Sequence, residues 1–124
     1  LFLVPAPAGA APPADDHVEQ VLTAEELITD GTTQKVFGCR IVGDSMEGAG
    51  IVSGDTVIVR QQETAKVGDV IVVTVDGELT IKRYERIGER AYLYPDNSGY
   101  QPLEILPQMN VRVWGVVAKV IHSL

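Results

Sequence analysis

The sequence contains a single cysteine, Cys39, and no long apolar run. One cysteine excludes an internal disulfide and a cysteine-rich zinc site, and it makes a reducing cytoplasm the simplest compartment. No stretch approaches the roughly 18 apolar residues that a transmembrane helix requires, so we expect no membrane contact. Histidine, cysteine and carboxylate residues form no cluster with metal-ligand spacing. We therefore predict neither a metal nor another cofactor.

Basic residues are scarce. Ten Lys and Arg residues stand against 17 Asp and Glu residues, which gives a net charge of −7 and a pI near 4.7. This is the wrong sign for a protein that binds nucleic acid by neutralising phosphates. We expect no direct nucleic-acid binding, and any role near DNA should run through a protein partner.

The chain is long enough for one compact domain, at 124 residues of which 45% are hydrophobic. Residues 1–16 are rich in proline and alanine, a composition that disfavours helix and sheet and predicts an extended, mobile arm. Thr23 and Glu26 then have the spacing of a capping box ahead of two apolar residues. This spacing predicts a short helix.

From residue 36 onward the sequence predicts β-strands. Six segments are rich in β-branched and aromatic residues: 36–42, 56–60, 70–75, 78–86, 91–94 and 111–121. Asp76 and Gly77 predict a tight hairpin, because a type I′ turn requires positive φ at both central residues. Other turn residues break the chain at short intervals. We therefore predict a mainly β fold, a compact and mostly antiparallel barrel or folded sheet, with the arm and the short helix as minor parts.

Lys82 lies in the middle of the strand that follows this hairpin. Period-2 alternation places Thr80, Lys82 and Tyr84 on one face of the strand. A lysine amine has an ordinary pKa of about 10.4, so it can act as a general base only where burial lowers that pKa by several units. A mainly apolar sheet can provide the burial, and Thr80 can orient the amine. The alternative is an ordinary strand lysine whose amine reaches solvent.

Ser45 follows Gly43 and Asp44 at the end of a predicted strand and precedes a glycine-rich segment, residues 48–50. Such a turn can expose a hydroxyl group and direct backbone N–H groups toward a developing oxyanion, with the N–H of Asp44 as a candidate. The alternative is a serine that only caps the turn.

Two histidines and the cysteine are the competing catalytic groups. His17 lies in or beside the predicted arm and His122 lies near the C-terminal end, so a Ser/His/Asp triad is disfavoured. Cys39 lies in an apolar predicted strand, where a buried core thiol is expected and not a nucleophile.

Taken together, these segments resemble the LexA/UmuD family of self-processing Ser/Lys peptidases. The matching blocks are VGDSM at 42–46, GI at 50–51, GD at 54–55, VIV at 57–59, GDVIV at 68–72, DGELTIKR at 76–83, LYPDNSGYQP at 93–102 and VWGVV at 113–117. The 37-residue spacing from Ser45 to Lys82 also fits the family. The resemblance covers nearly the whole chain.

The resemblance implies a signal-peptidase-like β fold in which Ser45 is the nucleophile and Lys82 the general base. Proteins of this family cut a bond in their own N-terminal arm, usually Ala-Gly or Cys-Gly, and the corresponding bond here is Ala8-Gly9. The implied organisation is an arm with the self-cleavage site at residues 1–20 and a Ser/Lys peptidase domain at residues 21–124.

The arm at residues 9–20 is most similar to that of UmuD-like accessory proteins of translesion polymerases. This likeness implies a cytoplasmic homodimer that cleaves itself on contact with a RecA–single-stranded-DNA filament after DNA damage. The product, beginning at Gly9, would work with a Y-family DNA polymerase of the UmuC type. Two alternatives stay open: the C-terminal dimerisation and autoproteolysis domain of a LexA-like or phage repressor, and a signal-peptidase-like enzyme.

Overall fold

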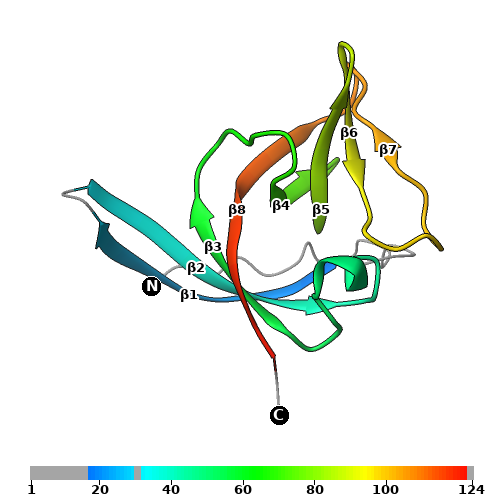
Figure 1. The fold of residues 1–124 in the computed structure, drawn as a ribbon. Coiled ribbons are helices and arrows are strands. Elements are labelled where there is room, and N and C mark those ends of the chain that lie inside the picture. The colour runs from blue at the N-terminus through cyan, green and yellow to red at the C-terminus, as the bar shows by residue number, and fades with distance from the viewer. Residues whose placement is uncertain (1–16, 30–31, 123–124) are drawn as a thin grey trace.

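The computed structural model describes residues 17–29 and 32–122, which form a mainly β fold as predicted (Figure 1). Its elements are β1 (His17–Thr29), β2 (Thr32–Val42), the 3-10 turn η1 (Glu47–Ala49), β3 (Thr56–Gln61), β4 (Val70–Val75), β5 (Glu78–Ile87), β6 (Arg90–Tyr94), β7 (Leu103–Glu104) and β8 (Val111–Ile121). The strands form one sheet in the order β1-β2-β3-β8-β4-β5-β6-β7. Every neighbouring pair is antiparallel. Within the described ranges, no helix is long and apolar enough to cross a membrane.

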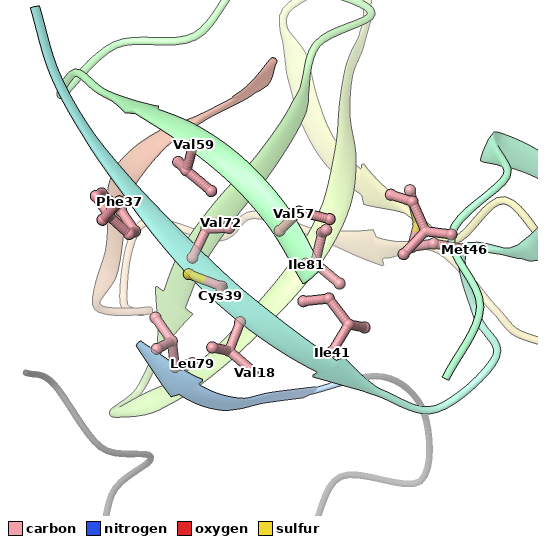
Figure 2. Packing of buried hydrophobic residues seen from close by; sticks show 11 residues of the cluster. Val18, Phe37, Cys39, Ile41, Met46, Val57, Val59, Val72, Leu79 and Ile81 are labelled. Atoms are coloured by element: carbon pink, nitrogen blue, oxygen red, sulfur yellow. The ribbon is translucent and has the colours of Figure 1, made fainter. Parts of the chain in front are cut away.

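The sheet curls back on itself, so that β1 contacts β5 although the two strands are not neighbours in the sheet (Figure 1). Buried side chains of both strands join one apolar cluster that includes Val18 of β1 with Leu79 and Ile81 of β5. Figure 2 shows this cluster gathered between β1, β2, β3 and β5. Burial of this apolar surface fixes the strands that carry the candidate site.

β4 is buried on both of its faces. Val72 belongs to the cluster of Figure 2, whereas Ile71 and Val73 belong to a second cluster with Leu93 of β6 and Val116 of β8. This arrangement follows from the alternation of side chains along a strand, because adjacent residues point to opposite faces. The second cluster therefore lies on the opposite face of the sheet from the first.

The Asp76-Gly77 hairpin joins β4 to β5 as predicted. Asp76 has a φ of 49° and Gly77 a φ of 88°, both positive as a type I′ turn requires. The backbone N–H of Asp76 donates a hydrogen bond to the carbonyl oxygen of Asn110 at 2.8 Å, and the Asp76 carboxylate accepts one from the Asn110 N–H at 2.8 Å. The hairpin is thereby tied to the start of β8 and sets the register of β5.

The prediction of a short helix at Thr23 and Glu26 is wrong, because both residues lie in β1. Thr23 pairs with Gly38 of β2 and Glu26 pairs with Lys35. Long-range pairing with a neighbouring strand overrides the local capping signal. The short helical turn of the fold is η1 instead, and the two-residue strand β7 was not predicted.

Candidate active site

Ser45 lies in the loop between β2 and η1. Gly43 enters this loop with a φ of 113°, a backbone conformation that glycine adopts without steric cost. The loop turns back immediately after Ser45, since the N–H of Glu47 donates to the carbonyl oxygen of Asp44 at 3.2 Å. Ser45 itself is 0% exposed. Its hydroxyl therefore faces the protein interior.

Lys82 lies in the middle of β5 and is 6% exposed. In the antiparallel register it stands opposite Ile71 of β4, and Thr80 stands opposite Val73. Directly opposed residues share a face of the sheet, so the amine emerges on the side of the second apolar cluster. The prediction that Lys82 and Thr80 share one face of the strand is confirmed, and the structure shows that both residues are buried there.

The two predicted reactive groups are in direct contact. The Lys82 Nζ donates hydrogen bonds to Ser45 Oγ at 3.3 Å, to Thr80 Oγ1 at 3.2 Å and to the carbonyl oxygen of Ile81 at 3.1 Å. All of these bonds are buried. The fold thus brings together a hydroxyl and an amine that are 37 residues apart in the chain.

A pocket of about 110 Å³ lies beside the amine. Thr80 and Lys82 line one part of it, and Leu93 of β6 and Leu103 of β7 line another. Its lining mixes three apolar residues with four polar or charged ones: Val75, Leu93 and Leu103 with Glu78, Thr80, Lys82 and Gln101. The pocket is a small recess beside Lys82.

Asp44 is exposed, and the loop after β6 holds it. Asn97 Nδ2 donates to the Asp44 carbonyl oxygen at 2.9 Å, and the Tyr100 hydroxyl donates to the Asp44 carboxylate. These contacts fix the peptide plane that precedes Ser45. The proposed contribution of the Asp44 N–H to an oxyanion hole stays a prediction.

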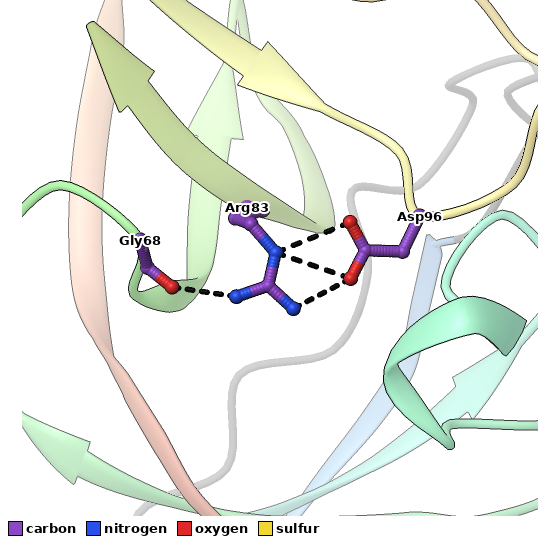
Figure 3. A network of polar contacts seen from close by, with 3 residues as sticks. All are labelled: Gly68, Arg83 and Asp96. Atoms are coloured by element: carbon purple, nitrogen blue, oxygen red, sulfur yellow. Dashed lines mark hydrogen bonds and ion pairs between the residues drawn. The ribbon is translucent and has the colours of Figure 1, made fainter.

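Arg83, the residue after Lys82, holds the same loop through Asp96 (Figure 3). The guanidinium Nη2 lies 2.5 Å from Asp96 Oδ2, and Nη1 donates to the carbonyl oxygen of Gly68 at 2.6 Å. The hydrogen bonds that Arg83 donates to the Asp96 carboxylate raise the pKa of Arg83. Sequence reasoning missed Arg83 and Asp96 as site residues, although both lie in blocks that resemble the family.

The competing catalytic groups lie elsewhere or outside the described residues. His122 Nδ1 lies 2.8 Å from Asp55 Oδ2, at the far end of β8. Nothing is described of the His17 side chain, and the predicted scissile bond Ala8-Gly9 falls outside the described ranges. Over residues 17–29 and 32–122, no group of three His, Cys, Asp or Glu residues is placed to hold a metal ion.

Cys39 is a core residue, as predicted. It is 0% exposed, and burial raises the pKa of its thiol to about 12. Since the thiolate is the reactive form, Cys39 is a poor nucleophile in the folded protein.

We expect iodoacetamide at pH 8 to leave native Cys39 unmodified for hours and to alkylate it rapidly in denaturant, as measured by intact mass. Rapid modification of the native protein would contradict this burial.

The sequence matches the Peptidase S24-like family over residues 2–118. It is 38% identical to LexA repressor 2 of Nocardia farcinica and 37% identical to the LexA repressor of Mycobacterium tuberculosis, each over 94% of this chain and 46% and 48% of those proteins. It is 45% identical to the LexA repressor of Syntrophotalea carbinolica over 69% of this chain and 43% of that protein. The chain thus spans about half the length of these curated relatives.

Proposed function

Since the chain belongs to the Peptidase S24-like family, we propose that it is the self-cleaving serine peptidase domain of a LexA-like repressor of the DNA-damage (SOS) response. Ser45 is the nucleophile and Lys82 the general base. The observation that carries the proposal is the buried contact of 3.3 Å between Lys82 Nζ and Ser45 Oγ. A nucleophile within hydrogen-bond reach of its base is the arrangement that covalent catalysis requires.

The surroundings of the amine fit the role of a base. A neutral lysine amine has two N–H groups and one lone pair. Thr80 Oγ1 and the Ile81 carbonyl oxygen can accept its two N–H groups, at 3.2 and 3.1 Å. The lone pair then faces Ser45 Oγ, whose hydroxyl becomes the donor. Thr80 thus orients the base and does not react.

The proposed reaction is intramolecular peptide hydrolysis. Lys82 takes the hydroxyl proton while Ser45 Oγ bonds to the carbonyl carbon of Ala8, and the Asp44 N–H is the candidate donor to the oxyanion. The protonated amine then gives its proton to the leaving nitrogen of Gly9, and water hydrolyses the Ala8 ester of Ser45. Tethering the substrate to the enzyme gives this reaction the advantage of high effective molarity.

The proposed organisation is an arm at residues 1–20 that carries the cleavage site and a peptidase domain at residues 21–124. β1 begins at His17, so the arm would enter the domain along the first strand of the sheet.

The repressor interpretation is favoured over the UmuD-like one. The relatives cited above are named LexA repressors, and the comparisons give no support to a translesion role or to a UmuC-like polymerase partner. For a LexA-like domain we propose a homodimer in the cytoplasm whose cleavage is stimulated by a RecA–single-stranded-DNA filament. The net charge of −7 is consistent with activation through a protein partner. A helix-turn-helix segment encoded upstream of Leu1 would support the repressor over the UmuD-like protein.

The proposed function predicts that alkali promotes cleavage. Incubation of the purified chain from pH 7 to pH 10 should raise the rate of conversion to a species beginning at Gly9, because a general base acts only in its deprotonated form. Intact mass and N-terminal sequencing measure the product and its first residue. A cut at another bond or a rate independent of pH would contradict the proposal. So would the absence of cleavage both in the presence and in the absence of an activated RecA filament.

A further inference from the structure

We propose that residues 95–100, the loop after β6, form a clamp that positions Ser45 against Lys82, and that the Arg83–Asp96 ion pair anchors this clamp. The inference rests on the proposed function, since its effect is on the rate of self-cleavage. It assigns positioning roles to Arg83 and Asp96, for which the resemblance supplied none.

The clamp contacts the Ser45 loop on both sides of the serine. Before Ser45, the Asn97 amide and the Tyr100 hydroxyl hold Asp44. After Ser45, the N–H of Gly48 donates to the carbonyl oxygen of Asp96 at 2.7 Å. Contacts on both sides restrain the serine backbone more effectively than one contact on either side.

The approach at Gly48 depends on the absence of a side chain. A Cβ atom built on Gly48 would lie 2.5 Å from the Asp96 carbonyl oxygen, closer than real Cβ contacts allow. Glycine therefore permits a direct bond between the two loops at this point. The Ser45 loop and the clamp fit together through their backbones as well as through their side chains.

The anchor ties the clamp to the strand that carries the proposed base. The Arg83 Nε lies 3.1 Å from each carboxylate oxygen of Asp96, and Nη2 lies 2.5 Å from Oδ2. The two side chains are 31% and 19% exposed. A charge-assisted bond of this multidentate kind fixes geometry as well as supplying energy.

The covalent chain, the Arg83–Asp96 ion pair and the hydrogen bond at Gly48 together connect Lys82 to Ser45. This connection runs from Lys82 to its neighbour Arg83, across the ion pair to Asp96, and over the backbone hydrogen bond to Gly48, three residues after Ser45. Arg83 points to the opposite face of β5 from Lys82, as strand alternation requires, and so it does not contact the reacting atoms. Its role is to set the distance between Ser45 Oγ and Lys82 Nζ.

The test compares cleavage by Arg83→Gln, Asp96→Asn and the double variant. Each single variant should lose about tenfold to a hundredfold in cleavage rate, since a misplacement of about 1 Å can cost roughly that much. The loss should persist at pH 10, because the clamp acts on geometry. The double variant should lose no more than the worse single variant, because either change breaks the same bridge. All rates are measured where circular dichroism shows folded protein.

Arg90→Gln is the matched control. It removes an exposed ion pair with Glu104, 3.9 Å apart, between β6 and β7, without touching the clamp. This variant should cleave at the wild-type rate. A folded Arg83→Gln or Asp96→Asn variant with wild-type cleavage, an equal loss in Arg90→Gln, or multiplied losses in the double variant would overturn the inference. Failure of the wild-type chain to cleave itself would instead overturn the proposed function.

Discussion

Replacement of Ser45 by alanine is expected to stop conversion of the chain to the species that begins at Gly9, with a loss of about a thousandfold or more. The change removes the attacking oxygen and leaves the base in place. Because Ser45 is fully buried and alanine is smaller, the fold should accept the substitution with little change. Intact mass followed over time at pH 10 measures the conversion, and circular dichroism checks the fold.

Ser53→Ala is the matched control for the nucleophile. Ser53 is an exposed serine nearby, whose hydroxyl accepts a hydrogen bond from the Gly43 N–H at 3.2 Å. Its replacement should leave cleavage within about twofold of wild type, as most changes of exposed residues are mild. Continued cleavage by folded Ser45→Ala would show that another group attacks. Loss of cleavage on Cys39→Ala in a folded variant would point to the thiol.

Most of the sheet could be predicted because its signals are local. β-Branched and aromatic runs marked β3, β4, β5 and β8, and two residues sufficed to predict the hairpin between β4 and β5. β1 was misjudged because its conformation depends on pairing with β2, which no local pattern encodes. A capping-box spacing has little weight against the pairing of β1 with β2, which includes both Thr23 and Glu26.

The candidate site, too, could be predicted only where the signal lies within one strand. Strand alternation was enough to predict that Thr80 and Lys82 share a face, because both belong to one strand. The contact of Lys82 with Ser45 joins two segments that neither strand alternation nor helical spacing relates to each other. It was predicted from the resemblance alone. Asp96 lies in an irregular loop, where neither alternation nor helical spacing indicates a partner. Its bond to Arg83 emerges only from the folded arrangement.

The choice between a repressor and a polymerase accessory protein could not be made from the arm. A proline- and alanine-rich segment specifies an extended conformation and small side chains, and these properties suit the substrate strand of any self-cleaving protein of this type. The composition of the predicted arm is therefore compatible with either alternative and does not distinguish them. The relatives that match 94% of the chain are named LexA repressors, and they favour the repressor.

Replacement of Lys82 by methionine is expected to abolish cleavage, again by about a thousandfold or more, without weakening the fold. Lys82 is 6% exposed and stands opposite Ile71, so burial of its amine costs free energy that a thioether of similar length does not incur. We expect the free energy of unfolding of Lys82→Met to rise by about 1 kcal/mol. Denaturant unfolding and intact mass at pH 10 measure the two effects.

Lys119→Met is the matched control, because Lys119 is an exposed lysine of β8. It should alter neither cleavage nor stability appreciably. Cleavage by folded Lys82→Met would remove the amine as the base. A fall of several kcal/mol in its stability would mean that the amine serves mainly as a structural donor to Thr80 and Ile81. A loss of activity together with a gain in stability would instead indicate that the buried amine destabilises the fold and is kept for catalysis. A lysine with a purely structural role would stabilise the fold.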